Sequence, residues 1–350
     1  MKKIAIFQTD LNFGGIQKSL INLLNNIDYK KYEIDLYLTC QNNIFMSDLN
    51  KKVNVFYIKP LPYLTRVVYF NILKLFYKSQ VKKEYDIAID FNSYSMDTAL
   101  AAVKTKARKK IIWVHNDIDL KLNEEPKYRT LYKFFKSKYK YFDSYVAVSN
   151  GALESFERHH CDADKEYNVI PNIIDTKEII EKSKEGNSLN VNDKKYNFCA
   201  VGRIEHQKGF DILLENIKEL VKLKTDFHLY IIGDGEEKED LIRYVRLNDL
   251  EDYVTFTGYV TNPYSIMKDM DGFVLTSRYE GQGMVFLEAK CLGLDIIMPK
   301  HIEKYIDEVK GTENILNSLN KVKKHKKKVD YLENYNTKII KSIDKLFKIR

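Results

Sequence analysis

Residues 271–293 have the sequence Asp-Gly-Phe-Val-Leu-Thr-Ser-Arg-Tyr-Glu-Gly-Gln-Gly-Met-Val-Phe-Leu-Glu-Ala-Lys-Cys-Leu-Gly. The apolar run 271–276 is typical of a buried strand. A polar loop with two glycines follows, and 284–292 has the composition of a helix that ends at Gly293. Strand, tight loop and helix in succession form the repeating unit of a parallel α/β sheet, and this is the fold class that the stretch predicts.

Two carboxylates bracket this loop. Glu280 lies in the loop, and Glu288 lies about one turn into the helix, where its side chain can lean back toward the N-terminus. The first amides of a helix lack internal partners and carry partial positive charge, and Gly281 and Gly283 let a ligand come close to the backbone. Amides for a diphosphate and acids for hydroxyls favour a sugar-nucleotide site. The alternative is a strand–helix corner with two solvated Glu.

Length and composition indicate a two-domain globular protein. The chain has 350 residues, of which 44% are hydrophobic and 30% charged. No apolar run reaches membrane-spanning length, and the residues after Met1 do not have the pattern of a secretory signal, so we expect a soluble or peripheral cytoplasmic protein. Cysteines without CxxC spacing argue against a disulfide framework or a structural zinc site. They are Cys40, Cys161, Cys199 and Cys291.

The net charge of +8 is unevenly placed. Residues 51–83 carry basic side chains among aromatic ones and contain no acid, and residues 127–142 repeat this composition. Such segments suit an anionic membrane surface, and we predict membrane contact through basic-aromatic helices 61–83 and 127–142. Nucleic acid is a second possible partner, which we do not favour. A solvated basic face over an aromatic core is the alternative that needs no partner.

The N-terminal half begins with a strand at 3–7, a polar loop with Gly14-Gly15 and an amphipathic helix at 16–24. This resembles the first unit of a nucleotide-binding sheet, although the glycine pair is not a GxGxxG fingerprint and is equally typical of a tight turn. His115 follows a later strand, where it either faces a ligand or is structural. The other expected strands are 34–38, 53–58, 86–90, 110–114 and 144–148, and the expected helices are 65–82, 95–106 and 125–140.

A polar stretch, 178–195, indicates a linker, and the pattern of strands and helices then starts again. The strand 196–201 runs into a loop with Arg203 and Lys208. These two cations can clamp a diphosphate, Arg by paired hydrogen bonds and Lys as a point charge. The alternative is a pair of solvated loop charges. Alternating strands and helices in both halves predict two parallel sheets, each covered on both faces.

An ordered set of motifs resembles family 4 of the retaining, GT-B-fold glycosyltransferases. The resemblance covers nearly the whole chain and is strongest over 196–294. It includes the Glu280-to-Glu288 pair, which matches the E-x7-E motif of that family. The other matching motifs are Phe13-Gly-Gly15, Trp113-Val-His-Asn116, Ile170-Pro-Asn-Ile-Ile-Asp175, Val201-Gly-Arg-Ile-Glu-His-Gln-Lys-Gly-Phe-Asp211, Ile232-Gly-Asp-Gly235, Val254-Thr-Phe-Thr-Gly258 and Ser277-Arg-Tyr-Glu-Gly281.

The resemblance implies two Rossmann-like, doubly wound domains that face each other across a cleft. An acceptor-binding domain is expected over 1–175, with a C-terminal helix at 331–350 packing back on it. A nucleotide-sugar-binding domain is expected over 190–330.

The resemblance also implies roles for particular residues. Arg203 and Lys208 would hold the diphosphate, Glu280 would accept hydrogen bonds from donor-sugar hydroxyls, and Glu288 would bind the ribose. His115 would contact the sugar or the acceptor near the reacting carbon. Backbone groups at the phosphates would come from Gly14, Gly15, Gly283, Met284 and Val285.

The implied activity is transfer of a sugar, with retention, from a nucleoside diphosphate sugar to a lipid-linked or surface-glycan acceptor. UDP is the expected nucleotide, with GDP and ADP as alternatives. Arg203, Lys208 and the helix amides would replace a metal at the leaving diphosphate. The Asp-x-Asp tripeptides at 117–119, 162–164 and 269–271 are attributed to chance. The alternatives are a sugar-nucleotide epimerase of similar fold and a non-catalytic basic module that binds membrane or nucleic acid.

Two departures from the family pattern concern the donor site. Pro299-Lys-His-Ile-Glu-Lys-Tyr305 replaces the usual Thr-Asp and glycine pair after the last strand, and Gln282-Gly283-Met284 replaces the commoner aromatic and Pro. Both leave the predicted cation clamp intact, and both put the identity of the donor sugar in doubt.

Overall fold

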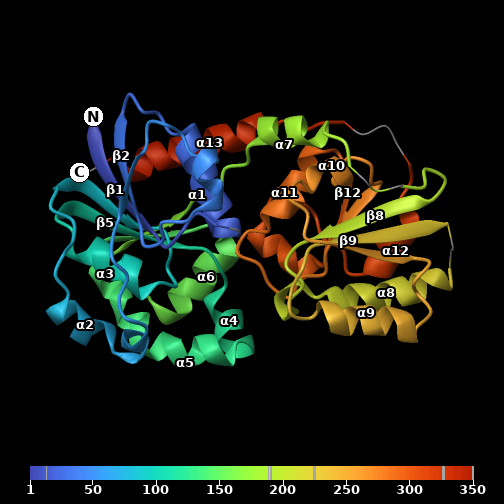
Figure 1. Ribbon diagram of the computed structural model, residues 1–350, viewed down its shortest axis with the longest axis horizontal. Coiled ribbons are helices and arrows are strands. Elements are labelled where there is room, and N and C mark those ends of the chain that lie inside the picture. The colour runs from blue at the N-terminus through green and yellow to red at the C-terminus, as the bar shows by residue number, and fades with distance from the viewer. Residues whose placement is uncertain (13, 188, 190, 224–225, 325–327, 349–350) are drawn as a thin grey trace. The chain divides into compact units, whose positions relative to one another are not determined.

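The computed structural model describes residues 1–12, 14–187, 189, 191–223, 226–324 and 328–348, with Arg66 described by its backbone alone. The residues outside this description include Phe13 of the glycine motif, parts of the expected linker and of the basic run 321–328, and the last two residues of the expected C-terminal helix. The chain divides into two compact units (Figure 1). Unit 1 comprises Met1–Ile173 and Asn334–Arg350, and unit 2 comprises Ile174–Glu333.

Unit 1 is built on a seven-stranded sheet among its described residues, with the order β3-β2-β1-β4-β5-β6-β7 and parallel pairing throughout. Ile4 and Phe7 of β1 point to opposite faces and are both fully buried. Burial on both faces explains why these strands are continuous apolar runs. The strands are β1 (Lys2–Gln8), β2 (Tyr32–Leu38), β3 (Asn54–Tyr57), β4 (Tyr85–Asp90), β5 (Ala107–Val114), β6 (Ser144–Ala147) and β7 (Glu166–Val169).

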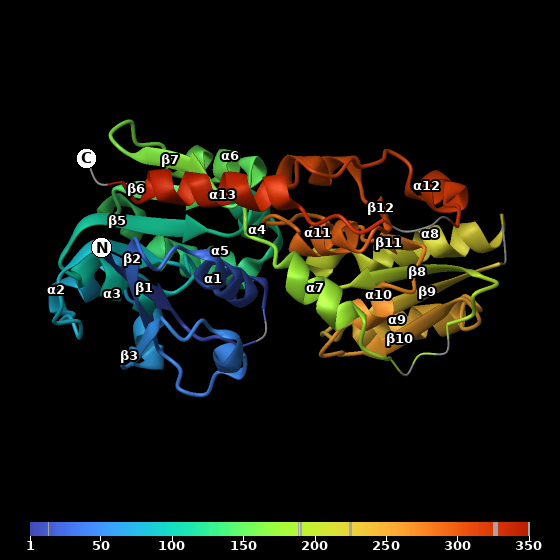
Figure 2. The same ribbon diagram turned by 90° about the horizontal axis from the view of Figure 1, so that it is seen from above.

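Helices cover both faces of this sheet. In Figures 1 and 2, α1 and α13 lie on one face, and α3, α5 and α6 lie on the other. The second face buries a single apolar cluster that joins Phe7 of β1 to Leu100 of α3 and Phe156 of α6. The helices are α1 (Gly15–Asn26), η1 (Ile44–Asp48), η2 (Tyr63–Val67), α2 (Phe70–Phe76), α3 (Met96–Lys104), α4 (Ile118–Glu124), α5 (Pro126–Phe135), η3 (Lys136–Tyr141), α6 (Asn150–His159) and α13 (Glu333–Leu346).

The C-terminal helix α13 packs on unit 1 through an apolar stripe and polar bonds at both ends. Ile339 and Ile343 are buried, as helical spacing of apolar residues predicts. The Tyr335 hydroxyl donates to the Asn172 carbonyl at 3.0 Å. Near the other end, the Tyr32 hydroxyl donates to the Asp344 carboxylate at 2.8 Å.

Unit 2 contains, in its described part, a five-stranded parallel sheet with the order β10-β9-β8-β11-β12. Helices α8, α9 and α12 pack on one face, and α7, α10 and α11 pack together on the other (Figure 1). The strands are β8 (Tyr196–Val201), β9 (Phe227–Ile232), β10 (Val254–Gly258), β11 (Gly272–Val274) and β12 (Asp295–Ile297). The helices are α7 (Thr176–Ser183), η4 (His206–Lys208), α8 (Phe210–Val221), α9 (Lys238–Leu247), α10 (Tyr264–Met267), α11 (Met284–Cys291), η5 (Lys300–Tyr305) and α12 (Ile315–Lys321).

Two segments differ from the sequence prediction. The stretch 178–195 begins inside helix α7, because the Asp175 carboxylate caps that helix through the Glu178 amide at 3.0 Å and Ile179 is buried. The predicted helix 65–82 is broken into η2 and α2. Its break falls at Val68-Tyr69, where a β-branched and an aromatic residue lower helix propensity.

Both sheets reverse their strand order beside their first strand. In unit 2 the chain builds β8, β9 and β10 outward on one side and then returns to place β11 on the other side of β8. Such a reversal leaves a crevice outside the carboxyl ends of the two central strands, and ligands of doubly wound sheets bind there. The loops that follow β8 and β11 are therefore the first place to look for a site.

Candidate functional site

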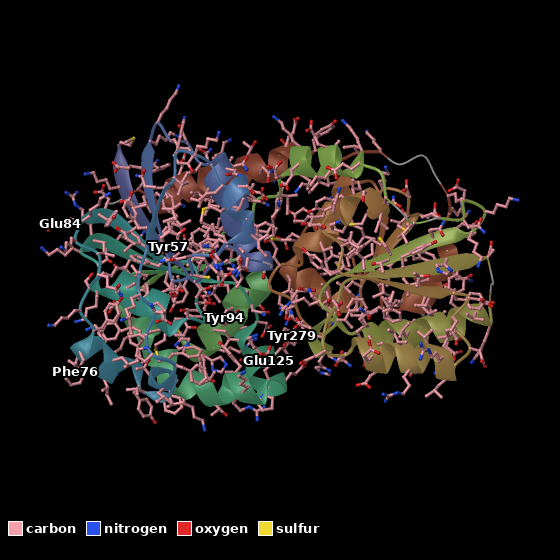
Figure 3. The ribbon with its side chains drawn as sticks, in the orientation of Figure 1. Tyr57, Phe76, Glu84, Tyr94, Glu125 and Tyr279 are labelled. Atoms are coloured by element: carbon pink, nitrogen blue, oxygen red, sulfur yellow. The ribbon has the colours of Figure 1, made fainter. Side chains whose placement is uncertain are left out.

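The loop after β8 and the loop after β11 are held together by hydrogen bonds in unit 2. The Arg278 amide donates to the Gln207 carbonyl at 2.8 Å, and the Gln207 side chain donates to the Tyr279 carbonyl at 3.0 Å. The Thr276 hydroxyl donates to the Gly209 carbonyl at 2.6 Å. Figure 3 labels Tyr279 in this region. The two loops thus behave as one structure, although about 70 residues separate them.

Glycine allows close backbone approach at two points, one between the loops after β8 and β11 and one between the loops after β8 and β9. Gly209 has a φ of +63°, and a Cβ atom there would lie 2.2 Å from the Thr276 carbonyl oxygen. Gly233, after β9, has a φ of +151°, and a Cβ atom there would lie 1.9 Å from the Gly202 carbonyl oxygen. A side chain at either position would push the loops apart.

Lys208 and Glu280 meet at the junction of these loops. The Lys208 ammonium lies 2.8 and 3.0 Å from the two oxygens of the Glu280 carboxylate. The Ser277 hydroxyl donates to the same carboxylate at 2.7 Å. Glu280 is only 3% exposed, which excludes the solvated-corner alternative for this residue. A buried carboxylate is tolerated because the ammonium and the hydroxyl replace its water.

Arg203 differs from Lys208 in its surroundings. Its side chain is 75% exposed and pairs with Glu205 at 3.0 Å. The structure therefore brings Lys208 and Glu280 together and leaves Arg203 on the surface of the same loop, as the solvated-charge alternative expects.

The N-terminus of α11 completes this part of unit 2. Gly283 has a φ of +70° and immediately precedes the helix, so Met284 and Val285 are its first residues. Glu280 comes three residues before Gly283, which puts the buried carboxylate and the first amides of the helix on one loop. Gln282, one of the departures from the family pattern, is buried in this loop.

Glu288 lies one turn further along α11, beside Tyr264 of α10. The Tyr264 side chain is buried and forms a hydrogen bond with Glu288. Burial raises the pKa of Tyr264 well above its usual value, and the carboxylates of Glu288 and Glu178 raise it further. The phenol therefore stays protonated and acts as a donor to Glu288.

His115, Gly14 and Gly15 belong to unit 1. His115 follows β5, and its Nε2 lies 2.9 Å from the Phe91 carbonyl, which can only accept, so Nε2 carries the proton. Burial lowers the pKa of His115 to about 3, so the ring is neutral near pH 7 and its Nδ1 is an acceptor. Gly14 has a φ of +158°, which residues with side chains rarely adopt, and Gly15 is the first residue of α1.

Among the described residues, no group of three or more His, Cys, Asp or Glu side chains is arranged to hold a metal ion. The Asp-x-Asp carboxylates have local partners. Asp117 caps α4 through the Leu120 amide at 3.0 Å, and Asp271 accepts from the Asn197 amide at 2.8 Å. Within the same described part, no helix is long and apolar enough to cross a membrane.

Sequence reasoning missed Ser277 and Tyr264. Ser277 lies inside the stretch from which the prediction started, three residues before Glu280, but a serine in a polar loop carries no signal of its own. Tyr264 lies in a short helix whose position beside Glu288 depends on the packing of α10 near α11, which no local pattern encodes.

Two family models match consecutive parts of the chain. "Glycosyltransferase Family 4" matches residues 13–178, and "Glycosyl transferases group 1" matches residues 181–341. Together they span most of unit 1 and nearly all of unit 2.

Two curated relatives are glycosyltransferases of bacteria. The chain is 24% identical over 318 residues to the N-acetylgalactosamine-N,N'-diacetylbacillosaminyl-diphospho-undecaprenol 4-alpha-N-acetylgalactosaminyltransferase of Campylobacter jejuni, covering 86% of this chain and 81% of that protein. It is also 24% identical over 318 residues to the lipopolysaccharide 1,6-galactosyltransferase of Salmonella typhimurium, covering 85% and 79%.

A solved structure with the same fold is Anabaena Alr3699/HepE in complex with UDP and glucose, with a TM-score of 0.72, 17% identity and 99% coverage of both chains. That likeness shows the GT-B fold, and the family models show the kind of enzyme. This chain belongs to glycosyltransferase family 4 and is a glycosyltransferase with two parallel-sheet α/β domains.

Proposed function

We propose that this enzyme transfers a sugar, with retention and without a metal, from a UDP-sugar to a lipid-linked or surface-glycan acceptor at the inner face of the plasma membrane. In this proposal unit 2 binds the donor and unit 1 binds the acceptor. The observation that carries the proposal is the buried Lys208–Glu280 pair at the β8/β11 reversal.

The chemistry of the pair suits a sugar nucleotide. When the bond from the anomeric carbon to the diphosphate breaks, negative charge grows on the leaving group. The Lys208 ammonium and the first amides of α11 are donors fixed near one point, and preorganised donors stabilise such charge. Glu280 accepts hydrogen bonds, which suits the hydroxyls of the sugar. Arg203 is exposed and can turn toward the diphosphate when the donor binds.

Glu288 and His115 have narrower roles in the proposal. Glu288 accepts from the ribose hydroxyls while Tyr264 holds its carboxylate. His115 is neutral and offers Nδ1 as an acceptor to a sugar or acceptor hydroxyl. Gly14 and Gly15 allow a phosphate to approach the start of α1. The named substrates of the relatives and the UDP bound in Alr3699/HepE support the donor and acceptor classes.

Donor binding is tested first with a thermal-shift panel of nucleotide sugars, because a ligand that binds only the folded state stabilises it. We expect UDP-sugars to raise the midpoint more than GDP- or ADP-sugars. A GDP- or ADP-sugar that stabilises more strongly would contradict the choice of UDP.

The substitutions Lys208→Ala and Glu280→Gln test the pair. We expect transfer to fall by about 10²–10³-fold, because each removes a group that acts on the transition state or the sugar. The control is Lys222→Ala, which breaks an exposed ion pair with Glu219 of 2.7 Å. The double variant Lys208→Met with Glu280→Gln leaves no buried charge unpaired, so we expect normal folding and no transfer. Full activity in that variant would contradict the proposal.

The anomeric configuration of the product tests retention. A proton NMR spectrum of the product, compared with the donor, should show the same configuration at the transferred carbon. An inverted product would refute retention, and an epimerised nucleotide sugar formed without acceptor would favour the epimerase alternative.

A further inference from the structure

Unit 1 exposes a concentrated group of large apolar side chains, which we name the apolar ridge. In the described part of the chain, sixteen large hydrophobic side chains are exposed, and seven of them fall within residues 63–76. Isolated exposed apolar residues are normal, but a cluster of this kind marks an interaction site. The ridge consists of Tyr63, Leu64, Val67, Tyr69, Ile72, Leu75 and Phe76.

Helix α2 has two apolar faces. Phe70 is fully buried against unit 1, and Leu73 and Tyr77 pack against the same core. Ile72, Leu75 and Phe76 have helical spacing as well and point outward, with Leu75 at 76% and Phe76 at 79% exposure. A helix on the surface of a water-soluble domain carries polar residues on its outer face. In Figure 3, Phe76 lies at the outer edge of unit 1.

The segment 127–142 contributes positive charge to this surface but no large exposed apolar side chain. Its aromatic residues Tyr132, Phe135 and Tyr139 are buried, so the aromatic part of the membrane prediction is wrong for this segment. Its helical spacing turns those rings into the core and leaves Lys133, Lys136 and Lys140 exposed, whereas Lys138 is buried. We name five lysines on or just after these elements the lysine belt: Lys74 on α2, Lys78 just after it, Lys133 on α5, and Lys136 and Lys140 on η3.

Ring contacts join the belt to the ridge. Tyr69 and Phe134 have ring centroids 5.1 Å apart, and the Lys74 ammonium lies 4.3 Å from the centre of the Tyr141 ring. The Tyr141 hydroxyl donates to Asn71 of α2 at 3.0 Å. Helix α2 therefore lies on η3, and η2 before it lies on α5. Figure 1 shows α2 and α5 along the same side of unit 1, so we infer that the ridge and the belt share this side.

The combination of charge and apolar area selects among possible partners. A second copy of this chain would bring one lysine belt against another, and like charges repel. Nucleic acid suits the lysines and the exposed rings of the ridge, but bases stack on rings and would leave the aliphatic Leu64, Val67 and Leu75 in water. An anionic bilayer suits both parts, because acyl chains cover the apolar side chains and lipid phosphates neutralise the lysines.

We propose that the apolar ridge inserts into the acyl-chain boundary of an anionic bilayer while the lysine belt binds its phosphate groups. This proposal deepens the proposed function, because it names the surface by which unit 1 reaches a lipid-linked acceptor. It rests on the proposed function only for the choice of that acceptor. The two-faced helix α2 is the element that enters the membrane, and the α5–η3 segment stays in the headgroup layer.

Insertion is measured by fluorescence of a Phe76→Trp variant. The chain has one tryptophan, Trp113, which is buried and gives a constant background. With vesicles of phosphatidylcholine and phosphatidylglycerol we expect a blue shift of the new tryptophan and quenching by brominated acyl chains. The control Leu247→Trp, at an exposed position on α9 of unit 2, should show neither change.

Vesicle flotation tests the contribution of the ridge. Leu75→Ser should weaken binding by about tenfold or more, because one fully exposed leucine no longer enters an apolar phase. Leu247→Ser is the matched control, since Leu247 is 76% exposed as Leu75 is, and it should float as the wild type does. Neutral phosphatidylcholine vesicles and high salt should both weaken binding, because the belt then loses its attraction.

Three outcomes would overturn this proposal: no blue shift at Phe76→Trp, equal flotation of Leu75→Ser and the wild type, or a concentration-dependent dimer that Leu75→Ser dissociates. Stabilisation by UDP separates this proposal from the proposed function. Leu75→Ser should keep the full UDP-induced thermal shift. If the wild type binds vesicles but no nucleotide sugar stabilises it, the donor proposal is refuted and the membrane proposal stands.

Discussion

Glu280 shows how a single buried carboxylate can be stable and still available to a ligand. Its oxygens bond to the Lys208 ammonium and the Ser277 hydroxyl, and each of these partners is replaceable by a ligand group. A sugar hydroxyl can take the place of one hydrogen bond to Glu280, while a diphosphate can attract the ammonium. In the proposed function, the pair would hold the site ready before the donor arrives.

In the proposed function Tyr264 positions Glu288, and Tyr264→Phe tests this at the residue scale. Removing the phenol oxygen takes one hydrogen bond from the Glu288 carboxylate. We therefore expect KM for the UDP-sugar to rise about fivefold to tenfold, as for loss of one hydrogen bond to a charged group, with kcat nearly unchanged. The variant should also discriminate less between UDP and 2′-deoxy-UDP in a thermal-shift assay.

Tyr331→Phe, at an exposed tyrosine, is the control for this substitution. A purely structural role of Tyr264 would lower the melting temperature and leave the preference for UDP over 2′-deoxy-UDP as it is in the wild type.

At the scale of elements, the site depends on two strand–loop–helix units that touch through their loops. The β8 unit supplies Lys208, and the β11 unit supplies Glu280 and the start of α11. Their contact needs the short turn η4 to end in a left-handed residue, which Gly209 provides. The same packing of the two loops therefore also positions Lys208 beside Glu280.

Gly209→Ala tests this contact. A methyl group would meet the Thr276 carbonyl and require a positive φ, so we expect a loss of roughly 1–3 kcal/mol in the free energy of unfolding and weaker nucleotide binding. Gly186→Ala is the matched control, because a Cβ atom there meets nothing within 4 Å. Chemical denaturation and UDP titration measure the two effects. Equal stability of the two variants would contradict the close approach seen at Gly209.

At the scale of the whole molecule, the two units differ in the ionisable groups they bury. Unit 1 contains His115 and His160, and burial lowers the pKa of each to about 3. It also contains Asp90 and Lys138, which are fully buried. Burial raises the pKa of Asp90 despite the Lys138 charge. Among the described histidines of unit 2, His228 has a pKa lowered mainly by burial.

These shifts predict that unit 1 is the more acid-sensitive unit. Between pH 6.5 and pH 3 the unfolded chain binds a proton on His115 that the folded chain does not, so the free energy of unfolding falls as pH drops. At pH 5 this amounts to on the order of 2 kcal/mol for His115, from an ordinary pKa of about 6.5. Asp90 acts in the opposite direction over the same range, because its pKa is raised.

Hydrogen exchange at pH 7 and pH 5 measures this difference unit by unit. We expect β5 and its neighbours in unit 1 to lose more protection than β8 and β9 in unit 2. His115→Asn should flatten the pH dependence in unit 1. An unchanged slope in that variant would show that His115 is not the group responsible.

Much of the fold was predictable because its signals are local. The apolar runs at β1, β5 and β8 predicted strands buried on both faces, and the glycine-bearing loop before Met284 predicted the helix start at Met284. The family resemblance then identified the kind of enzyme. The residues named for the donor site remain proposals in their roles, but the prediction that Lys208 and Glu280 each lie in a loop after a strand is confirmed by the positions of β8 and β11.

Tertiary structure decided what local patterns leave open. Residues 51–83 and 127–142 have the same basic-aromatic composition, yet the first exposes the apolar ridge and the second buries or half-buries its rings. The sequence alone determined strands, helices, glycine loops and enzyme family, because these depend on neighbours in the chain. Packing brings together groups from distant positions in the chain. It decides which carboxylate contacts Lys208 and which aromatic segment faces outward, and no local sequence pattern contains this information.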